Sequence, residues 1–203
     1  MLPRVLELAA DRDHRLLVGL AGPPGAGKTT LARDLRTALI AHGVSTAVVP
    51  MDGFHLANEE LRRLGRADRK GAPDTFDADG FVALLWRLWT CAETVVYAPA
   101  FDHVLNEPVA GSIPIPVDRR VIIIEGNYLL LDDGTWASVK PLLDLAVYVD
   151  TVSAQERITG LIERQIAKGL TPDAAEEWVM RSDEANARVI ATTRDRADVV
   201  VTR

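Results

Sequence analysis

The chain has 203 residues, of which 48% are hydrophobic and 26% are charged, and its formal net charge is −6 at pH 7. This balance is typical of one globular domain, and the negative charge argues against general binding to nucleic acid. A single cysteine excludes an internal disulfide, and no apolar run reaches the length of a membrane span, so a cytoplasmic protein without nucleic-acid or membrane partners is expected.

The first strong pattern along the chain is a phosphate-binding sequence between a strand and a helix. After a short helix expected near residues 5–10, the continuous apolar run 16–21 predicts a strand buried on both faces. Residues 22–29 then read Gly-Pro-Pro-Gly-Ala-Gly-Lys-Thr, which matches the pattern G-x-x-x-x-G-K-[ST] in full. Apolar residues at helical spacing predict a helix that starts near Lys28 and stops at Gly43.

The rest of the chain alternates strands with helices. Further strands are expected at 44–50, 94–98, 121–124, 145–149 and 199–201, and further helices near 56–63, 81–88, 135–143, 153–168 and from Thr171 onward. Residues 106–118 contain three prolines and predict a loop or an edge ribbon. The alternation predicts an α/β fold with a mostly parallel sheet and helices on both faces, in one domain over residues 1–203.

The loop at 22–29 is suited to hold the phosphates of a nucleoside triphosphate. Its glycines let backbone N–H groups turn toward phosphate oxygens, and the N-terminus of the next helix adds partial positive charge. Lys28 can reach the β- and γ-phosphates, and the Thr29 hydroxyl can hold Mg²⁺. A Gly-Pro surface turn, which is the alternative, does not account for the flanking strand and helix. The nucleotide-binding residues are therefore expected to be Gly22, Pro23, Pro24, Gly25, Ala26, Gly27, Lys28, Thr29 and Thr30.

Two acidic residues follow strands of the predicted sheet. Asp52 comes just after 44–50, and Glu125 ends the strand 121–124. Ligands of open α/β sheets bind outside the carboxyl ends of the strands, where the phosphate loop also lies. Asp52 is suited to take a proton from an attacking hydroxyl or to bind Mg²⁺ through water, and a turn aspartate before glycine is the alternative. Glu125 is suited to support Mg²⁺, with a capping role as the alternative.

The helix within the segment 153–170 carries a row of cations. Arg157, Arg164 and Lys168 have spacings of seven and four residues, which place them on one helical face. Such a row could close over transferring phosphate oxygens as a small lid. An ordinary solvated face, paired with neighbouring glutamates, is the alternative, and charge spacing alone does not choose between them.

Several segments in order resemble the phosphoribulokinase/uridine kinase family of P-loop kinases. They are Gly22–Thr29, Met-Asp-Gly-Phe-His at 51–55, Arg-Lys-Gly-Ala-Pro-Asp-Thr-Phe-Asp at 69–77, Pro-Ala-Phe-Asp at 99–102 and Ile-Glu-Gly-Asn-Tyr at 124–128. The tail 193–198 resembles the end of type I pantothenate kinases. Overall the chain is similar to small bacterial fructose transport system kinases and nucleoside kinase-like proteins. The resemblance covers nearly the whole chain and implies a P-loop NTPase three-layer sandwich with a small helical lid.

The resemblance also implies a reaction, in which ATP and Mg²⁺ serve to phosphorylate a hydroxyl of a small metabolite. It implies that Asp52 is the catalytic base, and that Lys28 and Arg164 act with it on the phosphates. Thr29 and Glu125 would lie on the magnesium side, and Arg194 would lie near the adenine. The residues implied for the acceptor pocket are Lys70, Phe101, Asn127 and Tyr128, to which His55 is added.

The sequence does not identify the acceptor molecule. Uridine kinases carry Tyr at the position of Phe101, followed by a His/Arg pattern that this chain lacks, and pantothenate kinases are longer. Sugars, pantothenate-like acids and nucleosides all remain candidates. The competing function is a regulatory ATPase or GTPase, but the chain has no N-K-x-D guanine motif and no D-x-x-G after an apolar strand. A homodimer would be unsurprising.

Overall fold

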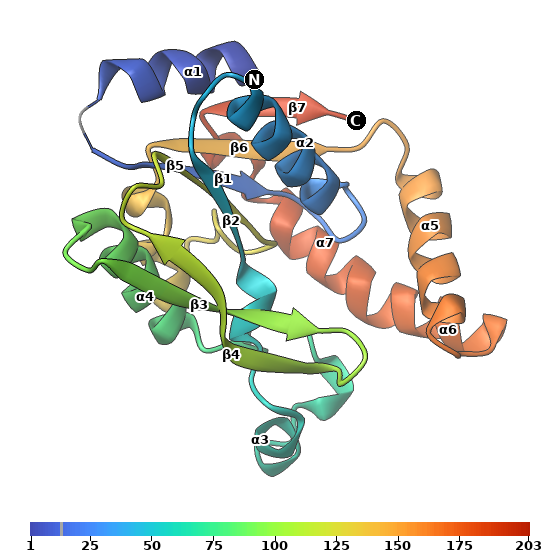
Figure 1. Cartoon of the computed structure of the whole chain (residues 1–203). Helices are drawn as coiled ribbons and strands as arrows, with labels where there is room; N and C mark the ends of the chain where they lie inside the picture. Colours follow the sequence, from blue (N-terminus) through green and yellow to red (C-terminus); the bar gives the residue numbers. More distant parts are fainter. Residues whose placement is uncertain (13) are drawn as a thin grey trace.

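The computed structural model describes residues 1–12 and 14–203 (Figure 1). Its centre is a sheet of five parallel strands in the order β2-β5-β1-β6-β7, which confirms the predicted parallel sheet. These strands are β1 (Leu16–Ala21), β2 (Thr46–Pro50), β5 (Val121–Glu125), β6 (Leu145–Asp150) and β7 (Val199–Thr202). Within the described part of the chain, no helix is long and apolar enough to cross a membrane.

Helices cover both faces of this sheet, because successive residues of a strand point to opposite sides. Leu16, Val18 and Leu20 of β1 belong to the apolar layer beneath α1 and α2. Leu17 and Ala21 belong to the opposite layer, which α4 and α7 help to close. The result is the predicted three-layer α/β sandwich. The helices that cover the sheet are α1 (Leu2–Asp11), α2 (Lys28–Ala41), α4 (Ala78–Thr90) and α7 (Glu184–Ala191).

The strand predicted at 94–98 does not join the parallel sheet. Instead β3 (Val95–Asp102) pairs antiparallel with β4 (Glu107–Pro116), so the edge-ribbon alternative for 106–118 is confirmed (Figure 1). Pro114 and Pro116 have no N–H to donate, which suits a two-stranded ribbon better than a sheet interior. The ribbon packs closely on the turn after β2, where a Cβ on Gly53 would collide with the carbonyl oxygen of Pro99.

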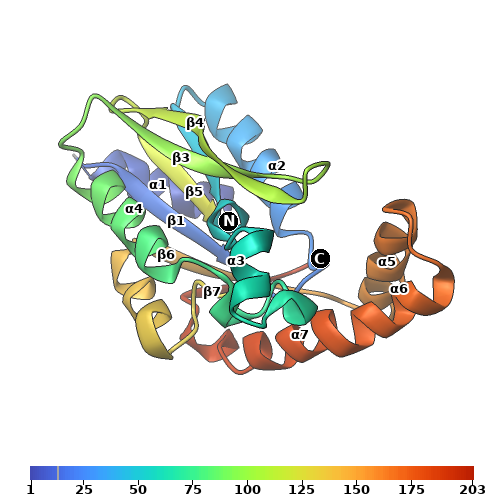
Figure 2. The ribbon, with the colours of Figure 1, turned by 90° about the horizontal axis from the view of Figure 1, so that it is seen from below.

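Two predicted helices differ in detail from the observed ones. Residues 135–143 form two 3₁₀ turns, Gly134–Ser138 and Lys140–Leu142, because Pro141 cannot continue a regular α-helix. The helix expected from Thr171 begins as predicted, with the threonine side chain capping it, and then continues into α7 through a π-helical turn. Figure 2 shows α5 and α6 side by side at one end of the molecule. Further helical elements are α3 (Asn58–Arg63), α5 (Ala154–Ala167), α6 (Pro172–Trp178), the π turn (Val179–Asp183) and short 3₁₀ turns at Met51–Phe54, Ala67–Arg69, Pro73–Thr75 and Arg194–Arg196.

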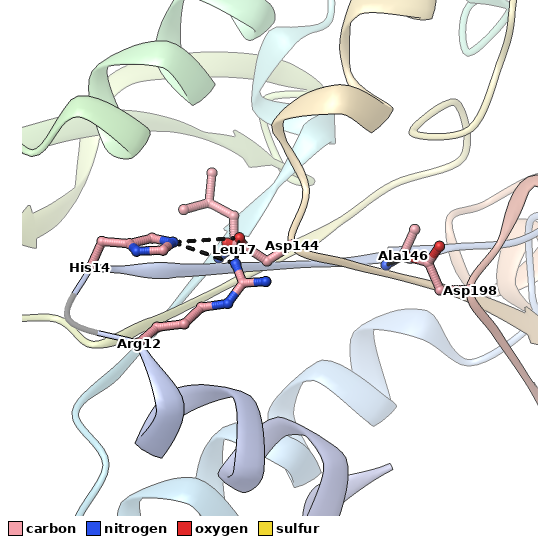
Figure 3. A network of polar contacts seen from close by, with 6 residues as sticks. All are labelled: Arg12, His14, Leu17, Asp144, Ala146 and Asp198. Carbon is pink, nitrogen blue, oxygen red and sulfur yellow. Dashed lines mark hydrogen bonds and ion pairs between the residues drawn. The ribbon is translucent and has the colours of Figure 1, made fainter.

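Two aspartates tie neighbouring strands together at their ends (Figure 3). Asp144 precedes β6 and accepts a 2.8 Å hydrogen bond from the backbone N–H of Leu17, while it also pairs with Arg12. Asp198 precedes β7 and accepts a 2.7 Å hydrogen bond from the backbone N–H of Ala146. Each carboxylate extends the hydrogen bonding of a strand pair by one acceptor, which helps to fix the register of β6 between β1 and β7.

Candidate active site

The phosphate loop joins β1 to α2 with a backbone that its glycines make possible. Gly25 has a φ of +79°, and a Cβ there would lie 2.9 Å from Cγ of Arg157. At Gly22, a Cβ would collide with the carbonyl oxygen of Val149. The loop is therefore pressed between the end of β6 and α5, and side chains at either position would push it out of shape.

Lys28 lies at the first turn of α2 with its ammonium turned back to the loop. Nζ donates to the carbonyl oxygens of Gly22, at 2.8 Å, and Pro23, at 2.9 Å. Burial lowers the pKa of Lys28 to about 8, although the charges of Glu125 and Asp52 oppose this shift. A buried cation whose hydrogen-bond acceptors, among the described residues, are two carbonyl oxygens, beside the N-terminus of a 14-residue helix, fits the phosphates of a nucleotide.

Thr29 and Glu125 lie beside each other at the mouth of the loop. The Thr29 hydroxyl donates to Oε1 of Glu125 at 3.3 Å, and β5 ends at this glutamate. Burial, and then the charge of Asp52, raise the pKa of Glu125 to about 7. The described residues contain no group of three or more His, Cys, Asp or Glu side chains that could hold a metal ion. Two oxygen ligands from the protein are too few to enclose a metal ion. They fit Mg²⁺, because this ion is usually bound by one or two protein ligands together with substrate phosphates.

Asp52 reaches the same place from the neighbouring strand. It belongs to the 3₁₀ turn Met51–Phe54, directly after β2, whose last residue Pro50 is in register with Glu125. A cavity of about 1220 Å³ is lined by Asp52 together with Lys28 and Glu125. The strand order thus brings together the predicted base, the predicted phosphate lysine and the predicted magnesium-side carboxylate.

Four of the five residues predicted for the acceptor pocket line this cavity, namely His55, Lys70, Phe101 and Asn127. The His55 ring contacts Phe101 in a tilted arrangement, with the ring centroids 4.8 Å apart and 51° between the ring planes. Burial lowers the pKa of His55. Tyr128 instead lies in the core behind this wall, where its hydroxyl donates to the carbonyl oxygen of Gly71 at 2.5 Å. Tyr128 therefore supports the loop that carries Lys70.

The cationic face of α5 has two separate environments. Arg164 and Lys168 line the cavity, as expected of a lid. Arg157 is buried, where it donates to the carbonyl oxygen of Pro24 at 3.1 Å and pairs with Glu184. Neither the lid alternative nor the solvated-face alternative describes Arg157, whose contacts fasten the phosphate loop to the helices behind it.

Arg194 lies outside the set of residues that line the cavity. It occupies the short turn before β7, and its Nε donates to Oδ2 of Asp150 at 3.0 Å. Asp150 ends β6, so the arginine is fastened to the same edge of the sheet as the phosphate loop. Its predicted place near the adenine stays a prediction.

The cavity also has lining residues that sequence reasoning missed. Asp183 and Asn186 line it from the π turn and the start of α7, and Asn186 donates to the carbonyl oxygen of Gly71 at 3.2 Å. Burial raises the pKa of Asp183, while the nearby cations Arg164 and Lys168 act in the opposite direction. A π turn has no distinctive residue spacing, and many other polar residues stand on the same helix, so no signal in the sequence distinguishes these two.

A phosphate loop, carboxylates at two strand ends and an arginine of α5 around one cavity define a P-loop phosphotransferase site. Residues 17–203 match the model of the Phosphoribulokinase / Uridine kinase family, and the chain belongs to that family. It is therefore a P-loop kinase that uses ATP, and its fold and family agree with those that the sequence predicts.

Individual relatives carry different names. The chain is 35% identical over 206 residues to a proposed uridine kinase of Schizosaccharomyces pombe, with 98% of this chain and 87% of that protein covered. It is 34% identical to the pantothenate kinase of Mycolicibacterium vanbaalenii, over 69% of this chain and 45% of that protein. Among solved structures, a proposed fructose transport system kinase from Silicibacter sp. TM1040 is 37% identical, with a TM-score of 0.89 over 99% of this chain and 98% of the other.

Proposed function

We propose that this chain transfers the γ-phosphoryl group of ATP to a hydroxyl group of a small metabolite, with Mg²⁺ as the metal ion. The observation that carries this proposal is the cavity in which Asp52, Lys28 and Glu125 meet. A triphosphate site alone would need only the loop and its lysine. A further carboxylate, Asp52, lies beside the loop on a cavity wall with aromatic and amide side chains. It gives an acceptor hydroxyl a base that can take its proton.

On the donor side, the chain's own groups hold and neutralise phosphate. The loop amides and Lys28 bind phosphate oxygens, and Arg164 and Lys168 approach from the lid. Thr29 and Glu125 would hold Mg²⁺, which when bound neutralises charge on the β- and γ-phosphates. These groups act by position and charge, since phosphoryl transfer asks for little covalent chemistry from the protein.

On the acceptor side, Asp52 orients the attacking hydroxyl and accepts its proton. The carbonyl oxygen of Asp52 lies 2.8 Å from Nδ1 of His55, so the turn that carries the base is fixed to the aromatic wall. The lid and the β3–β4 ribbon would limit water in the cavity during transfer. Excluding water matters because it competes with the acceptor for the phosphoryl group.

The proposal is tested by ADP release with a panel of acceptors that includes uridine, fructose and pantothenate, which the names of the relatives suggest. With a compound that stimulates ADP release, Asp52→Asn should lower kcat by at least about a hundredfold, the usual size of general-base catalysis. Asp11→Asn, at an exposed position in α1, is the matched control and should leave kcat unchanged. Turnover by the Asp52 variant within a few-fold of the wild type would contradict the assignment of the base.

A further inference from the structure

Lys70 is a half-buried cation on the acceptor wall, and no described carboxylate lies within ion-pair distance of it. Its Nζ donates to Oδ1 of Asn58, at 2.6 Å, and to the backbone carbonyl oxygen of Asn106, at 2.7 Å. Both acceptors are neutral. Burial lowers the pKa of Lys70, and the charge of Glu107 opposes this shift.

The nearest carboxylate is engaged elsewhere. The charge of Glu107 acts on Lys70, but both carboxylate oxygens of Glu107 accept from the backbone N–H of Asn58, each at 3.0 Å. Asn58 therefore stands between the two charges, with its amide N–H toward the acid and its side-chain oxygen toward the ammonium. An ammonium has three N–H donors, and the two neutral contacts use two of them.

The other cations that line the cavity come from other elements than Lys70 does. Lys28 belongs to the phosphate loop, and Arg164 and Lys168 belong to the lid. Lys70 instead comes from the segment between α3 and α4, next to the β3–β4 ribbon, where its Nζ lies 5.0 Å from the centroid of the Phe101 ring. A triphosphate bound at the loop would be neutralised by the cations of the loop and of α5. The charge of Lys70 is then left for the acceptor to neutralise.

A short row of side chains connects Lys70 to the proposed base. The Phe101 ring lies beneath Nζ, the tilted His55 ring contacts Phe101, and His55 is hydrogen-bonded to the backbone carbonyl of Asp52. A small molecule that places its hydroxyl at Asp52 can lay a short carbon chain along the two rings. The end of that chain then meets the ammonium of Lys70.

We propose that the acceptor carries an anionic group, a carboxylate or a phosphate monoester, which Lys70 binds while Asp52 receives the acceptor hydroxyl. This inference rests on the proposed kinase function and names the substrate class of the same site. A half-buried ammonium with only neutral partners is costly to maintain, and a ligand anion offsets that cost. Sugars and nucleosides without such a group provide no opposite charge for the ammonium of Lys70.

The experiment uses matched pairs of acceptors that differ in one charge, measured by ADP release from Mg·ATP. The carboxylate arm compares D-glycerate with glycerol and pantothenate with panthenol. The phosphate arm compares glycerol 3-phosphate with glycerol, fructose 6-phosphate with fructose, and uridine monophosphate with uridine. In at least one pair the charged member should have a kcat/KM at least about tenfold above its neutral partner, as expected for a charge-assisted hydrogen bond. The arm that responds identifies the anion.

Lys70→Met tests whether this preference comes from Lys70, because methionine keeps an apolar stem over Phe101 and removes the charge. It should lower kcat/KM for the charged acceptor at least about tenfold more than for its neutral partner. Lys140→Met is the control, since Lys140 pairs with Asp198 away from the cavity. An equal loss for both members would show that Lys70 only supports the fold, and the inference would be wrong.

The remaining outcomes separate the two proposals. If neutral acceptors are phosphorylated and no charged member exceeds its partner, the anion inference is overturned and the kinase proposal stands. If no charged compound of either arm is turned over, the inference is also wrong. If no neutral compound responds either, and ATP turnover does not depend on Asp52, the kinase proposal fails with it.

Discussion

Lys28 and Glu125 are oppositely charged side chains, and both are buried beside the phosphate loop. Burial brings their pKa values toward neutrality, to about 8 for Lys28 and to about 7 for Glu125, where Asp52 adds to the shift. A cation at Glu125 favours its ionised form. Binding of Mg²⁺ should therefore release a proton whenever the free protein holds one on this carboxyl group.

We expect the affinity for Mg·ATP to weaken below about pH 7, by up to about tenfold per pH unit, because the metal must displace the Glu125 proton. Calorimetric titration at pH 6, in two buffers of different ionisation enthalpy, counts the protons released. Glu125→Gln should bind Mg·ATP more weakly and release fewer protons. ATP with EDTA gives the contribution of the nucleotide itself, and an equal proton count for variant and wild type would contradict the role of Glu125.

At the scale of elements, one buried ion pair connects the phosphate loop with two helices. Arg157 of α5 bonds to the carbonyl oxygen of Pro24 and pairs with Glu184, the first residue of α7. Its side chain is only 6% exposed, so water cannot replace either partner. The loop, α5 and α7 are therefore held in one arrangement.

Arg157→Met should destabilise the protein by about 3 kcal/mol and raise the KM for ATP, because it leaves Glu184 and the loop carbonyl without a partner. Urea unfolding measures the first effect and steady-state kinetics the second. Arg63→Met is the control, since the pair Arg63–Glu60 is exposed on α3 and should contribute less than about 1 kcal/mol. Equal midpoints for the two variants would show that the buried pair does not stabilise the protein.

The strength of local signals explains which elements could be predicted from the sequence. The strand 16–21 and the helix after Lys28 have a continuous apolar run, a glycine motif and a helical period, and both are observed as β1 and α2. The strand near 95 has the same local pattern whether it joins the sheet or leaves it. Its pairing with β4 depends on residues further along the chain, which a local pattern does not contain.

At the scale of the whole molecule, the site is assembled from ends of strands that are distant in sequence. That Asp52, Glu125 and Lys28 meet could be predicted, because parallel strands all end at one edge of the sheet. Side-chain direction could not be predicted in the same way. Tyr128 follows Asn127 directly, yet it turns into the core while Asn127 lines the cavity, and Asp183 arrives through a π turn without a sequence signal.

The buried charges also shape how the stability of the free protein depends on pH. Between about pH 4.5 and 7, the folded state keeps the Glu125 proton that the unfolded chain gives up, so this group makes stability fall as pH rises. Between about pH 8 and 10.5, the unfolded chain keeps the Lys28 proton longer, so this group makes stability rise with pH. Together the two groups contribute least stability between about pH 7 and 8, where both are charged.

We therefore expect Glu125→Gln to increase the free energy of unfolding of the nucleotide-free protein at pH 7.5, by up to about 3 kcal/mol. The gain should shrink as the pH falls toward 4.5 and disappear below it, where Glu125 is neutral in both states, and urea unfolding from about pH 3.5 to 9 measures it. Lys28→Met should flatten the rise above pH 8 instead. Since Mg·ATP interacts with the ionised carboxylate, it should stabilise the wild type more than the glutamine variant. A variant with the same pH slope below pH 7 as the wild type would show that Glu125 does not retain its proton in the folded state.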